Sequence, residues 1–202
     1  MKFKNKVIAI AAAAALLIPI ATAQETSTAT TTTNKATINE RRENQQERIG
    51  NGVENGSLTA GEAGRLEHKE AALNKEIHTM KSDGNFTAAE RARVHRQQTA
   101  LSHQIYNQKH DAQTQNLDPK SEVGQRQLNQ QQRIGQGIEN GSLNAREASR
   151  LEHREAATNR EVAVMRQANG GKLTPNERRF VNHQQNRTSR AIYHQKHDRQ
   201  HR

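Results

Sequence analysis

Apolar residues from position 38 onward recur at intervals of three and four, the spacing that places side chains on one side of a helix. Between positions 60 and 81 that side holds Leu66, Leu73, Ile77 and Met80, and between 88 and 112 it holds Val94, Leu101 and Ile105. No segment alternates apolar and polar residues as a half-buried strand does. The pattern predicts an all-α fold.

The same pattern occurs twice along the chain. Residues 49–58 return at 134–143 and residues 65–72 at 150–157, each 85 positions later, and residues 105–111 return at 192–198 after an insertion of two. The copied apolar sides hold Leu151, Thr158, Val162 and Met165 on one helix and Val181, Thr188 and Ile192 on the next. Long matches in a fixed register indicate a tandem duplication.

Clusters of Gly and Asn divide each copy into three helices, because these residues adopt the left-handed conformation that ends a helix. The predicted helices are 38–52, 60–81 and 88–112 in the first copy, and 123–137, 145–167 and 175–199 in the second. The predicted organisation is a signal peptide at 1–23, a disordered Thr/Ala spacer at 24–37, helical repeat 1 at 38–112, a linker at 113–120 and helical repeat 2 at 121–202. We therefore expect two tandem copies of a three-helix unit, about six helices in all.

The N-terminus has the three parts of a cleavable secretory signal peptide. Three lysines within the first six residues precede an apolar run of about 14 residues, and Ala21-Thr22-Ala23 forms a small-x-small cleavage site. The run is shorter than the roughly 20 residues of a bilayer-spanning helix, and no second apolar stretch follows. We expect a periplasmic or secreted protein that is cleaved before Gln24 and does not span the membrane.

Composition limits the core and favours anionic partners. Leu, Ile, Val and Phe are 24 of the 179 residues after the signal, a fraction that argues against the large dry core of an enzyme. Ala, Glu, Gln and Arg are abundant and Pro is scarce, which favours helix. The formal charge of +10 falls to +7 once the three signal lysines are removed. The chain has no Cys, which excludes disulfides and thiolate metal sites.

The segment 83–90 resembles the second half of an EF-hand calcium loop, with Gly84 and Glu90 at the family's positions. The first and third positions of that pattern supply oxygen ligands, and here they hold Thr79 and Lys81. A lysine among the ligands argues against a calcium site.

Helix capping explains the same residues. In a capping box, a Thr or Asn side chain binds the backbone amide three residues later, while a Glu at that position binds back to the cap. Such pairs begin at Thr59, Thr87, Asn144 and Thr174. These motifs predict helix starts rather than ligand sites.

The Leu-Thr-x-x-Glu lettering that begins at Leu58 and at Leu173 resembles the Leu-Thr-x-x-Gln motif of the Spy and CpxP group of periplasmic proteins, with Glu in place of Gln. That group comprises small, cysteine-poor, signal-bearing, all-helical stress and chaperone proteins. The resemblance implies a periplasmic binding role and carries over no individual residue. A long tandem duplication is not part of what it implies.

Ten histidines supply candidate metal ligands. Those that share a helix face in the third helix of each copy are His103, His110, His194, His197 and His201. Neutral imidazoles in this arrangement could bind Zn²⁺ or Cu²⁺. The alternative is a solvated polar face opposite the apolar side. Only two pairs recur in both copies, His68 with His153 and His110 with His197.

Glu70 and its copy Glu155 lie at the margin of the apolar side of the second helix. A carboxylate there is expected to form an ion pair across the helix interface with an Arg or His of the third helix, and is less often a ligand or proton acceptor. No motif supplies a catalytic nucleophile, an oxyanion donor set or a cofactor site beside it. The sequence therefore indicates a non-enzymatic protein that needs no cofactor.

Two classes of function follow. The leading hypothesis is an exported helical binding protein, chaperone-like or envelope-associated, whose partners are unfolded proteins, envelope proteins or anionic envelope components. The alternative is a histidine-based protein that binds or buffers Zn or Cu. Nucleic acid is not favoured, because Arg and Lys alternate with Glu and Gln and export separates the chain from cytoplasmic nucleic acid. Assembly into a homo-oligomer stays open.

Overall fold

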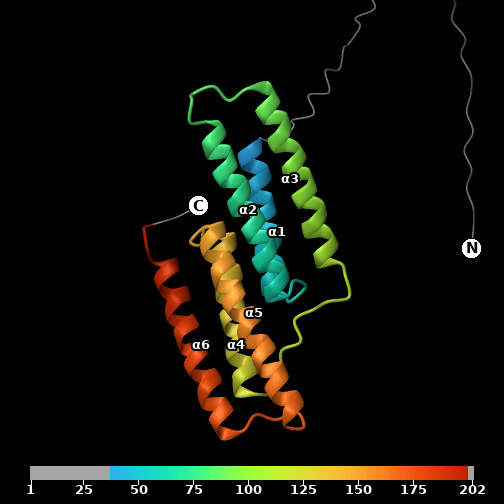
Figure 1. Ribbon diagram of the computed structural model, residues 1–202, viewed down its shortest axis with the longest axis vertical. Coiled ribbons are helices and arrows are strands. Elements are labelled where there is room, and N and C mark those ends of the chain that lie inside the picture. Colours follow the sequence, from blue (N-terminus) through green and yellow to red (C-terminus); the bar gives the residue numbers. More distant parts are fainter. Residues whose placement is uncertain (1–36, 200–202) are drawn as a thin grey trace, which may run out of the picture. The chain divides into compact units, whose positions relative to one another are not determined.

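The computed structural model describes residues 37–199, and these contain six α-helices and no strand (Figure 1). The helices are α1 (Ile38–Glu54), α2 (Ala60–Met80), α3 (Ala88–Lys109), α4 (Glu122–Glu139), α5 (Ala145–Ala168) and α6 (Pro175–Lys196). The all-α prediction is confirmed, and every predicted helix end lies within three residues of the observed one. The signal peptide and nearly all of the spacer lie outside the described residues. None of the described helices is long and apolar enough to cross a membrane.

Local capping chemistry sets the helix starts. Capping boxes are present at the four predicted positions, Thr59, Thr87, Asn144 and Thr174, which confirms that prediction. Thr37, the last residue of the predicted spacer, forms a fifth box with Glu40 and begins α1. In the EF-hand-like segment, Glu90 accepts hydrogen bonds from the amide and the hydroxyl of Thr87, both at 2.8 Å. The carboxylate therefore serves to start α3.

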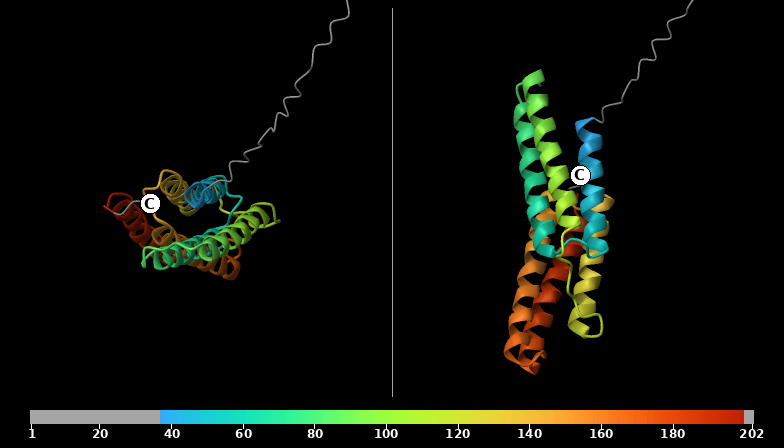
Figure 2. Two further views of the ribbon diagram at one scale, coloured as in Figure 1. Left: turned by 90° about the horizontal axis from the view of Figure 1, so that it is seen from above. Right: turned by 90° about the vertical axis from the view of Figure 1, so that its right-hand side faces the viewer.

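The duplication in the sequence produces a two-fold relation in space. Helices α1 to α3 pack together, α4 to α6 pack together, and the halves meet where α1 packs on α4 and α2 packs on α5 (Figures 1 and 2). A Cβ atom on Gly50 would lie 2.9 Å from the carbonyl oxygen of Gly135, and one on Gly135 would lie 2.9 Å from that of Gly50. Each helix of these two pairs thus meets its own copy, and a pseudo-two-fold axis relates the halves.

One apolar core joins the two halves. Its buried members come from equivalent positions: Ile49 and Ile134, Val53 and Ile138, Leu58 and Leu143, Ala63 and Ala148, Leu66 and Leu151, and Ile105 and Ile192. Because these side chains form a single cluster, neither repeat completes its core alone. Most residues predicted to face inward on the second and third helices are buried, among them Leu73, Val94, Leu101 and Val162. Ile77, Met80 and Met165, near the ends of α2 and α5, are only half-buried.

Glutamine side chains occupy several buried positions between the helices, where apolar residues would be usual. Gln45 on α1 donates a hydrogen bond to the carbonyl oxygen of Gln98 on α3 at 2.7 Å, and Gln98 donates back to the carbonyl of Ile38 at 2.8 Å. The second half repeats both contacts, because Gln130 donates to the carbonyl of Gln185 at 2.8 Å and Gln185 donates to the carbonyl of Val123 at 2.9 Å. These glutamines are no more than 2% exposed. Buried amides with satisfied donors let a chain poor in apolar residues close its helix bundles.

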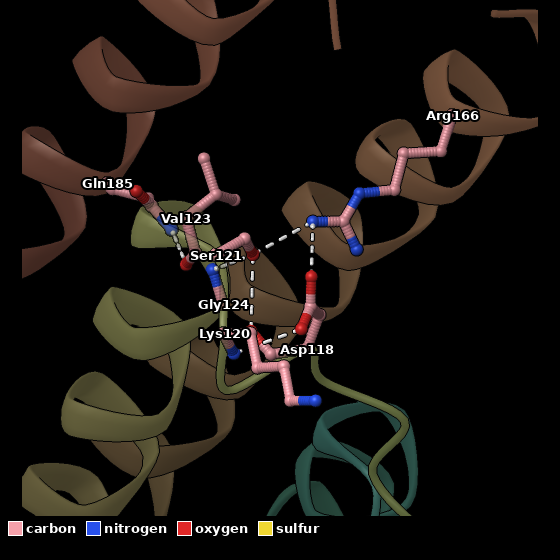
Figure 3. A network of polar contacts seen from close by, with 7 residues as sticks. All are labelled: Asp118, Lys120, Ser121, Val123, Gly124, Arg166 and Gln185. Carbon is pink, nitrogen blue, oxygen red and sulfur yellow. Dashed lines mark hydrogen bonds and ion pairs between the residues drawn. The ribbon is translucent and has the colours of Figure 1, made fainter. Parts of the chain in front are cut away.

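The end of the linker is fixed to the second half (Figure 3). Arg166 of α5 donates to the hydroxyl of Ser121 at 3.0 Å and forms an ion pair with Asp118 at 3.7 Å. The backbone amide of Lys120 donates to Asp118 at 3.0 Å, and this hydrogen bond is the main reason that the pKa of Asp118 is lowered. A Cβ atom on Gly124 would overlap the carbonyl oxygen of Asp118, so this turn requires glycine.

Candidate functional site

The recurring histidines at the ends of α3 and α6 have matching surroundings. His110 and His197 are the C-caps of these helices, and the Nδ1 atom of each lies 2.7 Å from the carbonyl oxygen of Tyr106 or Tyr193. Each imidazole also stacks on that tyrosine, with ring centroids 4.1 and 4.2 Å apart. Since a carbonyl only accepts, Nδ1 carries the proton, and Nε2 is left as the nitrogen that could bind a metal.

The other candidate histidines do not complete a metal site within residues 37–199. His103 and His194 are exposed, and His201 lies outside the described residues. In the described part of the chain, no group of three or more His, Asp or Glu side chains is arranged to hold a metal ion. Zn or Cu binding therefore stays a prediction, and it would rely on one or two imidazoles at the surface.

Besides the capping-box residues Glu62 and Glu147, four glutamates are buried on α2 and α5. Glu70 and Glu155, the two that the sequence pattern selects, are each 1% exposed. Glu67 and Glu152, three residues before them, are 0% exposed. The apolar pattern does not identify Glu67 and Glu152 as buried residues. Both recur, each next to a leucine of the apolar side, and this recurrence is the sequence feature that could have identified them.

Glutamines of α1 and α4 bind Glu67 and Glu152. The Nε2 atom of Gln46 donates to both oxygens of Glu67, at 3.1 and 3.0 Å, and Gln131 donates to Glu152 at 3.0 Å. Burial raises the pKa of Glu152 well above its ordinary value; the Gln131 hydrogen bond opposes this effect, and the charges of Glu155 and Glu67 add to it. Because Glu67 belongs to α2 and Glu152 to α5, the two halves share this polar cluster.

Glu155 has a different environment. No ion pair within residues 37–199 includes Glu155, and its Oε1 atom has no hydrogen-bond partner there. Burial raises the pKa of Glu155 to about 8. The sequence predicts an ion pair with the third helix, whereas the surroundings of Glu155 favour a neutral carboxyl, because a buried carboxylate without a counter-ion is costly. Within this cluster, the raised pKa values of Glu152 and Glu155 let these two side chains keep their protons to a higher pH than an ordinary glutamate does.

The linker makes the two halves unequal at this cluster. The side chain of Gln115 donates to the carbonyl oxygen of Leu58 at 3.1 Å and also to the side-chain oxygen of Gln131. The copy of Gln131 is Gln46, whose buried Oε1 atom has no hydrogen-bond partner within the described residues. The linker therefore satisfies the amide of one half and not that of the other.

A groove of about 390 Å³ lies between α2 and α5. Its lining includes His68 and Lys75 of α2 and Arg146, Arg150 and His153 of α5, with small Ala and Ser side chains and no Asp or Glu. The two helices touch here, because the hydroxyl of Ser149 donates to the carbonyl oxygen of Gly64 at 2.9 Å. We call this feature the α2–α5 groove.

The cations of the α2–α5 groove are available to a ligand. Lys75, Arg146 and Arg150 are exposed, and none of them forms an ion pair within residues 37–199. Guanidinium groups present paired donors that match phosphate and carboxylate oxygens, so the groove can bind anions. The recurrence of His68 and His153 was visible in the sequence, but only the packing of α2 on α5 brings them into one groove.

No protein-family model, curated protein or solved structure matches this chain. The resemblance to the Spy and CpxP group therefore stays a prediction. Function has to be argued from the residues and the geometry described above.

Proposed function

We propose that this chain is an exported, non-enzymatic helical protein that binds anionic components of the cell envelope. The observation that carries the proposal is the α2–α5 groove, whose charged lining is entirely basic and includes unpaired exposed cations. The formal charge of +10, or +7 after the expected cleavage, adds a general attraction for anions. Export would bring the protein to acidic polymers and anionic lipids of the envelope.

The lining of the groove supports binding rather than catalysis. Imidazoles and cations line it, and no carboxylate in the lining could orient His68 or His153 as a general base. We therefore assign no catalytic residue.

The exposed apolar residues give less support to a chaperone that holds unfolded chains. Among residues 37–199, the large exposed ones are Tyr106, Leu128, Val164, Phe180 and Tyr193, and they are distributed over α3, α4, α5 and α6. Isolated exposed apolar residues are normal on soluble proteins, whereas a site for unfolded chains needs a continuous apolar patch. Among the partners expected from the sequence, anionic components fit best.

The test measures binding of the exported protein to anionic vesicles and to an acidic polymer, each beside a neutral counterpart, at low and high salt. We expect binding to the anionic forms only, weakened by salt because exposed charges are screened. The double variant His110→Ala with His197→Ala should bind them unchanged.

Absence of binding to every anionic probe at low salt would refute the proposal. Stoichiometric Zn²⁺ or Cu²⁺ binding that is micromolar or tighter, and that the double histidine variant loses, would favour the metal-buffering alternative instead. That binding should also fade as pH falls through about 6.5, where imidazole is protonated.

A further inference from the structure

The basic side chains beside the contact between α2 and α5 occur in repeated pairs. Arg65, His68 and Lys75 of α2 correspond to Arg150, His153 and Arg160 of α5. On each helix these positions are spaced by three or by seven, so they follow one side of the helix. All six are exposed. Each helix therefore carries a line of basic side chains along the same side.

The pseudo-two-fold axis divides this basic surface into two related parts. His68 and His153 are equivalent to each other and line the same groove, so the axis passes between them. On one side of the axis the groove holds Lys75, Arg146 and Arg150, and the equivalent positions on the other side are Arg160, Gly61 and Arg65. The basic surface thus continues across the axis, and the side with Arg146 is more positive.

We infer that the α2–α5 groove and its continuation across the axis bind a linear acidic polymer, an inference that rests on the proposed function. The stretch of α2 from Arg65 to Lys75 covers about 15 Å, which is several monomers of a polymer and more than one small anion occupies. A small anion needs donors that converge on one point, whereas these cations are exposed and spaced along two helices. Repeated cations on both sides of an axis match repeated anionic groups.

The shape of the basic surface favours a polymer strand over a membrane. The cations flank a groove between two helices rather than covering a flat face. A strand can lie in such a groove and contact Arg and Lys from both helices. A bilayer surface would contact the outermost side chains and leave the groove unfilled.

The experiment measures the affinity of the exported protein for long-chain polyphosphate at one low salt concentration. The groove variant combines Arg146→Gln and Arg150→Gln. The matched control combines Arg96→Gln and Arg190→Gln, two exposed arginines of α3 and α6 outside the groove that have no ion pair within the described residues. Both variants lose the same net charge. We expect the groove variant to lose at least about tenfold in affinity and the control less than about threefold, because only the groove arginines make charged hydrogen bonds with the polymer.

Inorganic phosphate and vesicles of anionic lipid form two further arms. We expect free phosphate to bind far more weakly than the polymer, and vesicle binding to be equally affected by the two variants. Equal loss of polymer binding in both variants would overturn the inference and leave the proposed function standing, because net charge would then explain the attraction. Vesicle binding without polymer binding would also overturn the inference and leave the proposed function standing. Failure of every anionic probe would overturn both.

Circular dichroism and thermal melts establish that both variants are folded. Should the double arginine variant melt well below the parent protein, Lys75→Gln with Arg150→Gln removes the same charge from the same groove and replaces it in the comparison. Polyphosphate affinity retained in that folded variant would equally refute the inference.

Discussion

Replacing Glu155 with Gln tests whether the buried carboxyl of α5 is neutral at neutral pH. The substitution keeps the shape of the side chain and removes its ionisable group. Burial raises the pKa of Glu155 from its ordinary value of 4.5 to about 8. The folded protein therefore holds this proton more tightly than the unfolded chain does. The stability linked to this group is fully present below pH about 4.5 and is lost as the pH rises toward about 8.

The size of the effect follows from the pKa difference. One pKa unit corresponds to about 1.4 kcal/mol, so a shift of about 3.5 units sets an upper limit of about 5 kcal/mol on the cost of ionising Glu155 in the folded state. The Glu155→Gln variant escapes this cost. We expect it to be more stable than the parent by about 2 to 4 kcal/mol near pH 8 and nearly unchanged near pH 5. For a protein of this size the gain near pH 8 corresponds to a rise in Tm of about 5 to 15 °C.

The assay is urea unfolding followed by circular dichroism at several pH values between about 5 and 8. Glu43→Gln is the matched control, because Glu43 is exposed on α1 and should leave the pH dependence unchanged. A Glu155→Gln variant that is less stable than the parent near pH 8, or that shows the same pH dependence, would refute the neutral carboxyl. That outcome would instead support an ionised Glu155 in an ion pair, as the sequence suggests.

Three further predictions concern caps and glycines, each measured by denaturant unfolding. Thr87→Ala and Thr174→Ala should each cost about 0.5 to 2 kcal/mol without changing any metal affinity; loss of calcium binding at unchanged stability would instead support the EF-hand resemblance. Gly135→Ala should lower the free energy of unfolding by about 1 to 3 kcal/mol, since its Cβ would press on the α1 backbone. Gly61→Ala should raise it by about 0.5 to 1 kcal/mol, because there the Cβ meets nothing nearer than an Arg65 nitrogen at 3.5 Å. Equal effects of the two substitutions would exclude the close crossing of α1 and α4. Gly124→Ala should cost more than about 2 kcal/mol, and an unchanged stability would show that the linker turn can move.

Helices and their starts could be predicted because their causes are local. A Thr followed three residues later by Glu makes a capping box whatever surrounds it, and intervals of three and four define an apolar side. The duplication likewise appears in the letters alone. Thr37 was not predicted as a helix cap, because it ends a Thr/Ala tract that has no helical pattern. Its capping box with Glu40 is seen only in the structure.

The glutamine core could not be predicted, because the same letter occurs inside and outside the bundle. In the run Gln130-Gln131-Gln132 the first two side chains are buried and the third is exposed. Which of them faces inward depends on how α4 is rotated against α5 and α6. Propensity and hydropathy treat all three alike, so the sequence does not reveal which glutamines form the buried amide contacts of the structure.

The α2–α5 groove could not be predicted from the sequence, because it also depends on how the helices pack. His68 and His153 are 85 residues apart, and only the packing of α2 on its own copy makes them neighbours. The packing of the helices also determines whether Glu155 has an ion-pair partner. A carboxylate near an apolar stripe is usually paired, but its partner must come from another helix, and a single sequence does not say which side chains face it.

The duplication explains how the basic surface came to differ on its two sides. Two identical chains around a two-fold axis would have an isologous interface, in which every contact occurs twice and every substitution changes both sides at once. Within one chain the copies can diverge. Arg146 stands where the first copy has Gly61, and Ser149, which donates to the backbone of α2, stands where the first copy has Gly64. Gly61 and Gly64 leave room on α2, while Arg146 and Ser149 on α5 add a charge and a hydrogen bond. The two copies therefore keep a nearly symmetric contact between α2 and α5, while only one side of it carries the additional arginine and the Ser149 hydrogen bond.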